Sequence, residues 1–317
     1  MSILVTGGAG FIGGHLADAL LKNNDVIVLD NFNTYYEPAI KRNNIKHNLD
    51  NENFQLIEGD IRDKDLVRKI INENSVDYVF HEAAQAGIRI SVENPAKSHE
   101  INATGSLNVL NACLDSNVKK FINASSSSVY GKAITLPFTE DSPNLPVSPY
   151  GVTKLAVEHY CRVFQEVYGL KTISLRYFTV YGPRMRPDLA ISIFTKKAFN
   201  NEPLVIFGSG EKTRDFTYID DIVEATIKAM NKGSGEYNIG SSNRISINKL
   251  AENIIKITKS SSEIIHTEPQ KGDAEHTWAD VGKAKKELGW QPTIDINEGL
   301  NKFAEWQRTQ YFIKTQK

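Results

Sequence analysis

Among the twelve tyrosines of this 317-residue chain, Tyr150 alone has a lysine four positions later, Lys154. On a helix this spacing places both side chains on one face. A nearby ammonium stabilises a phenolate and lowers a tyrosine pKa from about 10 toward the neutral range. A tyrosine in that setting can act as general acid and base toward a hydroxyl group. The same pair also arises by chance on a solvated helix face, so a second signature must support the assignment.

A glycine-rich turn near the N-terminus, TGGAGFIG, is that second signature. A short apolar run at residues 3–5 predicts a buried strand before it, and an amphipathic helical pattern follows it. Gly7, Gly10 and Gly13 permit a tight turn and the close approach of a pyrophosphate to the helix N-terminus. Asp30 ends the next predicted strand, where a carboxylate accepts ribose hydroxyls and repels a 2′-phosphate. The sequence therefore predicts an NAD site.

The composition excludes several classes of function. The hydrophobic content of 40% and charged content of 24% are typical of globular proteins. A formal net charge of −1 offers no basic field for nucleic acid. No apolar stretch approaches the ~20 residues that span a bilayer, and the first strand begins too early for a signal peptide. Cys113 and Cys161 fall in helical patterns and are expected to be small buried residues, which fits the cytoplasm. The histidines show no metal-ligand spacing, so no metal site is expected.

Strand and helix patterns alternate through the first half of the chain. The predicted strands end near Asp30, Glu58, Phe80, Ala124 and Arg176. This alternation predicts an α/β fold, a doubly wound parallel Rossmann sheet, whose ligands bind beyond the carboxyl ends of the strands. We expect an NAD-binding domain over residues 1–176 and a smaller C-terminal α+β lobe over 177–317 for the substrate. Whether the segment at about 213–230 returns to the first domain is left open.

Six motifs occur in order along the chain: TGGAGFIG, SSSSVYG, YGVTK, RYFTVYGP, RDFTYIDD and TWAD. Together they resemble the extended short-chain dehydrogenase/reductase family, in its nucleotide-sugar epimerase and dehydratase branch, over essentially the whole chain. The resemblance implies that Ser126 hydrogen-bonds the sugar oxygen being oxidised and that Tyr150 takes its proton. It also implies that Lys154 binds the nicotinamide ribose and lowers the tyrosine pKa.

The serine run distinguishes between reactions of this branch. Dehydratases of the family carry an Asp–Glu pair, and decarboxylases keep the glutamate, where this chain has Ser127 and Ser128. Serines cannot do that acid–base chemistry at neutral pH. The resemblance then implies epimerisation, in which C4 of the sugar is oxidised to a ketone and reduced again from its other face. An NAD-linked sugar dehydrogenase and a non-catalytic NAD sensor are the remaining alternatives.

Thr179 and the segment that begins at Arg186 bear on the choice of sugar. UDP-glucose 4-epimerases commonly have asparagine at the position of Thr179, whereas UDP-glucuronate 4-epimerases resemble this chain in having threonine and a following RPD. Gln270 also resembles the uronate group. A guanidinium binds a carboxylate in a two-pronged fork. We therefore expect UDP-glucuronate as substrate, with UDP-glucose as the alternative. For Arg186 the alternative is a role at the protein surface or in binding the diphosphate.

Further site residues follow from the resemblance alone. The remaining NAD contacts it implies are Phe11, Ile12, Asn31, Asp60, Ile61, Ala83, Ala84, Gln85, Asn102 and Tyr177. The substrate contacts it implies are Ser127, Ser128, Thr179, Arg186, Phe207, Arg214 and Asp273. For Asn102, Tyr177 and Phe207 a packing role is the alternative. The resemblance also implies a homodimer joined through the helices that start near Ala96 and Tyr150.

Overall fold

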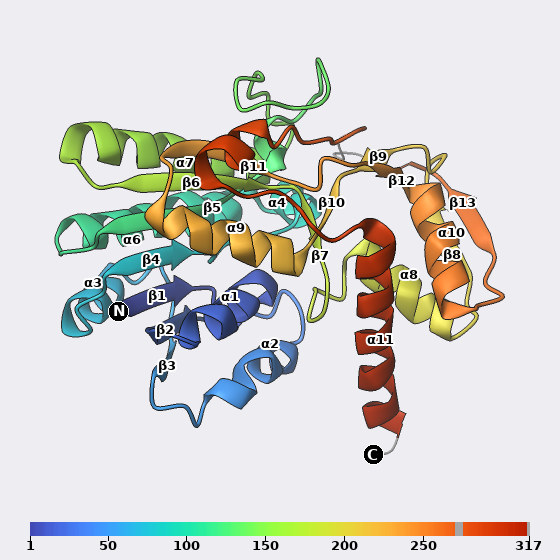
Figure 1. The fold of residues 1–317 in the computed structure, drawn as a ribbon, viewed down its shortest axis with the longest axis horizontal. Coiled ribbons are helices and arrows are strands. Elements are labelled where there is room, and N and C mark those ends of the chain that lie inside the picture. Colours follow the sequence, from blue (N-terminus) through green and yellow to red (C-terminus); the bar gives the residue numbers. More distant parts are fainter. Residues whose placement is uncertain (270–274, 316–317) are drawn as a thin grey trace.

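The computed structural model describes residues 1–269 and 275–315 and contains two lobes (Figure 1). Its strands are β1 (Ser2–Thr6), β2 (Asp25–Asp30), β3 (Phe54–Glu58), β4 (Tyr78–His81), β5 (Lys120–Ser126), β6 (Thr172–Tyr177), β7 (Thr179–Tyr181), β8 (Leu204–Phe207), β9 (Thr213–Arg214), β10 (Phe216–Tyr218), β11 (Gly235–Ile239), β12 (Ile245–Ser246) and β13 (Ile264–Thr267). Its α-helices are α1 (Phe11–Leu21), α2 (Pro38–Ile45), α3 (Lys64–Glu73), α4 (Ile88–Glu93), α5 (Pro95–His99), α6 (Gly105–Leu114), α7 (Pro149–Tyr168), α8 (Ala190–Phe199), α9 (Ile219–Asn231), α10 (Ile247–Thr258) and α11 (Ile296–Thr315). Short helical turns are η1 (Lys46–Asn48), η2 (Glu100–Thr104), η3 (Ser127–Val129) and η4 (Ala284–Leu288).

The largest sheet of the described residues has seven strands in the order β11-β6-β5-β4-β1-β2-β3, all parallel. The doubly wound parallel sheet expected from the sequence is confirmed. The direction of winding reverses between β1 and β4, because the chain moves from β1 through β2 to β3 and then returns to β4 on the other side. In such sheets this reversal opens a crevice at the carboxyl ends of the strands.

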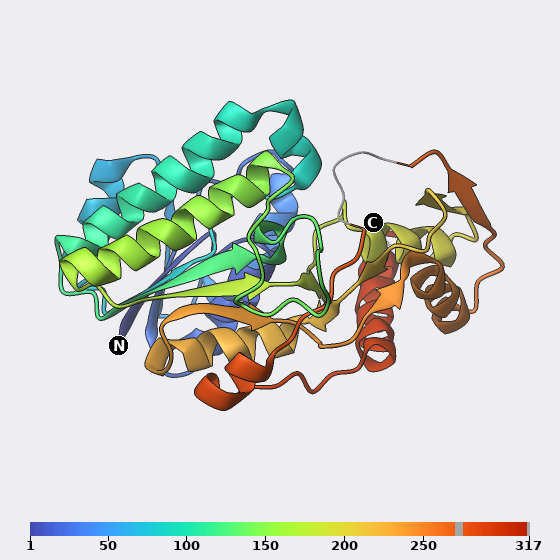
Figure 2. The same ribbon diagram turned by 90° about the horizontal axis from the view of Figure 1, so that it is seen from above.

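Helices cover both faces of this sheet, as Figure 2 shows with α6 and α7 on one side and α9 on the other. On one face α1 and α9 bury apolar side chains such as Leu16 and Ile222 against the strands. On the other face α3, α6 and α7 do so with residues such as Val109 and Val157. The strands are therefore buried on both faces, which explains their nearly continuous apolar sequences.

Helix α7, which carries the tyrosine–lysine pair, has well-defined ends. Ser148 caps its N-terminus, because its hydroxyl accepts a hydrogen bond from the Gly151 N–H at 3.1 Å, and Pro149 occupies the first turn. Gly169 ends the helix in the left-handed region at φ +76°. These signals set the phase of the helix, so Tyr150 and Lys154 both reach the carboxyl edge of the sheet.

Strand β11 extends the sheet beyond the boundary expected at residue 176. Gly235–Ile239 pair in parallel with Ile173–Tyr177 of β6, and both Tyr237 and Ile239 are buried. Helix α9 covers most of the segment at about 213–230, whose domain the sequence did not decide. It packs against α1 on one face of the same sheet. The chain thus leaves the sheet after β6 and later returns to it. Local strand–helix alternation cannot reveal such a return, because the intervening residues belong to the other lobe.

The second lobe lies beside the carboxyl ends of the strands, with α8, α10, β8 and β13 grouped together in Figure 1. Its core includes Phe194, Leu204, Leu250 and Phe303, from α8, β8, α10 and α11. Strand β8 pairs with β13, β7 with β10, and β9 with β12. None of the helices described is long and apolar enough to cross a membrane.

Candidate active site

A cleft of about 1060 Å³ runs along the carboxyl edge of the sheet and between the two lobes. This volume exceeds that of most pockets for a single small molecule, so the cleft has room for a large ligand or for two. The predicted site residues that line it are Gly7, Gly10, Phe11, Ile12, Gly13, Asp30, Asn31, Asp60, Ile61, Ala83, Ala84, Ser126, Ser127, Ser128, Tyr150, Lys154, Tyr177, Thr179, Arg186, Phe207 and Arg214. Predicted Asp273, like Gln270, lies outside the described residues.

The glycine turn forms one end of the cleft. Gly7 has φ +69°, and a Cβ there would lie 2.7 Å from the backbone nitrogen of Ala83. A Cβ on Gly13 would collide with the carbonyl oxygen of Gly7. Only glycines therefore allow β1, the turn and α1 to approach so closely. The first residues of α1 line the cleft, and no side chain caps the N-terminus of this helix, which suits a diphosphate.

Asp30 lies at the end of β2 beside this turn and is buried. Its carboxylate accepts hydrogen bonds from the backbone N–H groups of Ala9 at 3.1 Å and Phe32 at 2.8 Å. Burial raises the pKa of Asp30, and these two donors act against the rise. The two oxygens have further lone pairs. The carboxylate is thus held in place with capacity left to accept the hydroxyls of a ribose.

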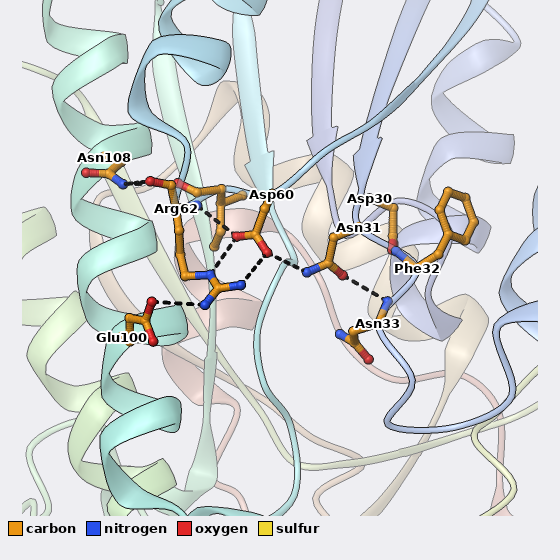
Figure 3. A network of polar contacts seen from close by, with 9 residues as sticks. Asp30, Asn31, Phe32, Asn33, Asp60, Arg62, Glu100 and Asn108 are labelled. Carbon is orange, nitrogen blue, oxygen red and sulfur yellow. Dashed lines mark hydrogen bonds and ion pairs between the residues drawn. The ribbon is translucent and has the colours of Figure 1, made fainter.

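A polar network links the loops that follow β2 and β3 (Figure 3). The Asn31 amide donates to Asp60 at 2.8 Å, and the Arg62 guanidinium donates to both oxygens of Asp60, at 3.0 and 2.9 Å. Arg62 also binds Glu100 of η2 at 2.9 Å. Burial alone would raise the pKa of Asp60, but the hydrogen bonds from Arg62 and Asn31 hold it at about 2. The network fixes the rim of the cleft around Ile61.

Tyr150, Lys154 and the serine run meet at the opposite end of the cleft from Asp60. The ammonium nitrogen of Lys154 lies 5.9 Å from the centroid of the Tyr150 ring and donates to the carbonyl of Ala124 at 2.6 Å. The Ser126 hydroxyl accepts the Ser128 N–H at 3.1 Å and donates to the Ser128 hydroxyl at 3.1 Å. The arrangement brings a phenol, an ammonium and aliphatic hydroxyls to one wall.

A buried ion pair supports the serine run from behind. The guanidinium of Arg176 binds the carboxylate of Glu158 through two contacts, at 2.9 and 2.7 Å, and both side chains are almost fully buried. Ser125 donates to the same carboxylate at 2.5 Å, and Arg176 also binds the hydroxyl of Tyr130 at 2.9 Å. These contacts tie β5, β6 and α7 together directly beneath Ser126.

Arg186 lines the cleft, but its guanidinium already has a carboxylate partner. It binds both oxygens of Asp188 at 3.0 Å, and Tyr35 donates to Asp188 at 3.0 Å. The guanidinium carbon lies 5.3 Å from the Tyr35 ring centroid. The fork expected to hold a substrate carboxylate is therefore occupied by an internal one, so a substrate carboxylate must displace Asp188 or bind beside the pair.

The second lobe contributes Phe207 and Arg214. Phe207 is 45% exposed, which excludes the alternative that it is a buried packing residue, and the Arg89 guanidinium lies 5.6 Å from its ring centroid. Arg214 donates to the carbonyls of Thr213 at 2.9 Å and Glu275 at 3.2 Å. An exposed aromatic ring suits stacking with a flat base.

Gln85 and Asn102, two of the implied NAD contacts, are not among the residues that line the cleft. Both are buried, and the Asn102 amide accepts the Gln85 N–H at 2.7 Å and donates to the Gln85 carbonyl at 3.2 Å. It also donates to Thr153 at 3.0 Å. The amide is occupied with buried polar groups of the loop and of α7. These hydrogen bonds join the loop at Gln85 to α7 through Asn102.

Several residues that line the cleft were not selected from the sequence. They are Tyr35, Lys41, Glu82, Arg89, Asp188 and Lys212. Glu82 directly follows β4, so the rule that ligands bind beyond strand ends would have found it. The others lie on loops and helices whose paths the sequence does not specify. No group of three or more potential metal ligands occurs among the described residues.

Comparison with known proteins places this geometry in context. The family model described as GDP-mannose 4,6 dehydratase matches residues 4–303. The chain is 40% identical over 309 residues to UDP-glucuronate 4-epimerase of Thermodesulfobacterium geofontis, covering 96% of this chain and 95% of that one. It resembles the structure of UDP-glucose 4-epimerase from Thermotoga maritima with UDP-glucose (TM-score 0.92, 39% identity, 98% and 100% covered). It also resembles UDP-glucuronic acid 4-epimerase from Bacillus cereus in complex with UDP-glucuronic acid and NAD (TM-score 0.93, 38% identity, 98% and 100% covered).

Proposed function

The chain belongs to the nucleotide-sugar epimerase branch of the extended short-chain dehydrogenase/reductase family, and we propose that this NAD-dependent UDP-sugar 4-epimerase interconverts UDP-glucuronate and UDP-galacturonate. The observation that carries the proposal is the composition of one wall of the cleft. Tyr150, Lys154 and Ser126 lie there beside the hydroxyls of Ser127 and Ser128, and Thr179 also lines the cleft. The wall has hydroxyls where elimination of water would need carboxylates, although the matching family model is named for a dehydratase.

The residues of the cleft fit the cofactor. The glycine turn accommodates a diphosphate, Asp30 offers acceptors to a ribose, and the Asp60 network forms the rim at the adenine end. NAD supplies the acceptor, and later the donor, of the two electrons that C4 of the sugar loses and regains. The protein positions the sugar and moves its hydroxyl proton.

Tyr150 takes the proton of the C4 hydroxyl while C4 is oxidised, and Ser126 donates a hydrogen bond to the same oxygen. The Lys154 ammonium nitrogen lies 5.9 Å from the centroid of the Tyr150 ring, so its positive charge is next to the group that exchanges the proton. The resulting 4-keto sugar rotates and presents its other face, while the second lobe retains its nucleotide. Tyr150 then returns the proton to the oxygen, and the configuration at C4 is inverted.

The hydroxyls of Ser127, Ser128 and Thr179 support a carboxylate at C6, because each can donate one hydrogen bond to it. Arg186 supplies the positive charge, provided that it exchanges Asp188 for the substrate. UDP-glucose is the second candidate. The bidentate contact between Arg186 and Asp188 favours it, since a neutral hydroxymethyl group needs no free cation.

The test is to incubate the purified protein with UDP-glucuronate, UDP-glucose, UDP-N-acetylglucosamine and UDP-xylose and to follow C4 by proton NMR. We expect UDP-glucuronate to be converted with a kcat/KM at least about tenfold above that for UDP-glucose, which corresponds to about 1.4 kcal/mol. An equal or higher value for UDP-glucose would overturn the choice of sugar but not the reaction.

We also propose a homodimer formed through α7. Its outer face carries the exposed apolar side chains Val152, Tyr160, Val163 and Val167, which follow helical spacing and so form one stripe. Helix α5 packs against α7 and lies next to this stripe. Pairing with the same helices of a second copy would bury the stripe in a four-helix contact.

A further inference from the structure

Glu82 is a carboxyl group on the wall of the cleft that the epimerase mechanism leaves without a role. It directly follows β4 and lines the cleft. A Cβ on Gly7 would lie 3.0 Å from the carbonyl carbon of Glu82, so this residue is adjacent to the glycine turn. The hydrogen-bond partner of its carboxyl group is neutral: it is the hydroxyl of Tyr177, at 3.0 Å.

The hydrogen bonds around Glu82 accommodate either protonation state. The Tyr177 hydroxyl also lies 2.8 Å from the Thr226 hydroxyl, which donates to the carbonyl of Ile222 at 2.7 Å. If Glu82 is ionised, Tyr177 donates to it. If Glu82 is protonated, it donates to Tyr177, which donates to Thr226, and every proton still has an acceptor. The network therefore imposes neither protonation state, and the charge of Glu82 depends on what occupies the cleft.

The position of Glu82 places it at the nicotinamide end. Tyr150 and Lys154 must reach the carbon that exchanges electrons with the nicotinamide ring, so the ring lies on their side of the glycine turn. Lys154 is close enough to lower the pKa of Glu82, although burial, the larger effect, raises it to about 7. Tyr177, which holds Glu82, lines the same end of the cleft.

We propose that the Glu82 carboxylate stabilises the oxidised, cationic nicotinamide relative to the reduced, neutral one and so keeps the 4-keto sugar scarce. This inference rests on the proposed function in taking NAD as the cofactor. Oxidation of C4 would pass a hydride, one proton with two electrons, to the ring and cancel its positive charge, while the hydroxyl proton would go to Tyr150. A fixed negative charge nearby opposes this step and favours its reversal. Less keto sugar is then lost before it is reduced again.

The charge of Glu82 can be removed without removing its hydrogen bond. In Glu82→Gln the side-chain carbonyl still accepts from Tyr177, whereas Glu82→Leu removes both charge and acceptor. Glu93→Gln is the matched control, because Glu93 lines the same cleft but is exposed to solvent on α4. The readout is the reduction potential of the bound cofactor, measured in the full-length holoenzyme at pH 8.5 by equilibration with redox dyes and absorbance at 340 nm.

We expect Glu82→Gln to raise the potential by about 30 mV or more, which is a tenfold or larger shift for a two-electron couple. Glu82→Leu should shift it in the same direction, and Glu93→Gln should leave it unchanged. An unchanged potential in Glu82→Gln overturns the inference, as does a shift confined to Glu82→Leu, which would assign the effect to the hydrogen bond. If the wild-type protein holds no NAD, the proposed function fails instead.

A pH series adds an independent check. The groups that face Glu82 are Tyr177 from β6 and Lys154 from α7, while the neighbouring His81 stays neutral because burial and Lys154 lower its pKa to about 3. Glu82 is ionised above its pKa, so the difference between wild type and Glu82→Gln should be full at pH 8.5. It should shrink as the pH falls below about 7. A difference that is constant from pH 6 to 9 would contradict the inference.

Discussion

Replacing Arg186 by leucine should separate the two candidate sugars. A charge-assisted hydrogen bond to a carboxylate contributes about 1.5–3 kcal/mol, so losing the guanidinium should reduce kcat/KM for UDP-glucuronate by about 10- to 150-fold. The Arg186 side chain is only 19% exposed, so solvent screens this contribution weakly. UDP-glucose has no carboxylate, and its kcat/KM should change by less than about threefold on the same reasoning.

Asp188→Asn tests the exchange that this prediction assumes. Asp188 occupies the guanidinium through two contacts of 3.0 Å, and neutralising it removes the internal competitor while Arg186 stays in place. The KM for UDP-glucuronate should therefore fall, and that for UDP-glucose should not. Arg68→Leu is the control, because Arg68 also pairs with an aspartate, Asp115, at 2.7 Å, and neither residue lines the cleft. The assay is initial-rate NMR or coupled detection with both sugars for every variant. Equal losses on the two sugars in Arg186→Leu would refute the carboxylate role.

Three further outcomes are expected. Tyr150→Phe should still fold and bind NAD, but its rate of epimerisation should fall by at least the ~10²-fold typical of a lost general base. An undiminished rate by proton NMR would show that Tyr150 is not that base. Glu158→Gln strands the buried Arg176 guanidinium and should lower the free energy of unfolding by about 3–5 kcal/mol in urea titrations; a loss below about 1 kcal/mol would show that the pair is solvated. Val163→Glu places a charge in the apolar stripe of α7 and should give a monomer by light scattering, so a variant that remains dimeric would exclude this interface.

Much of the catalytic wall was predictable from local spacing. The glycine turn, Asp30 and the Tyr150–Lys154 pair depend on residues within one strand, one turn or one helix. Those relations are set by backbone geometry and survive any arrangement of the rest of the chain. The doubly wound parallel sheet followed from the alternation of strand and helix patterns in the first half of the chain.

The remaining features required the folded chain. Strand β11 joins the sheet only after the chain has passed through α8 and β8 of the second lobe. Tyr35 and Asp188, which engage Arg186, are separated by 153 positions and meet through loops. The hydrogen bonds between the Asn102 amide and the backbone of Gln85 join residues 17 positions apart, and no local pattern predicts them.

The sequence by itself determined the class of chemistry, because a phenol beside an ammonium and a glycine-lined diphosphate turn are encoded by residues close together in the chain. Tertiary structure alone decided what charges face the ligands. It paired Arg186 with an internal carboxylate and placed Glu82 beside Tyr177 on the wall of the cleft. The physical reason is that electrostatic environment depends on distance in space, and the loops at the carboxyl edge of the sheet bring together residues that no local pattern connects.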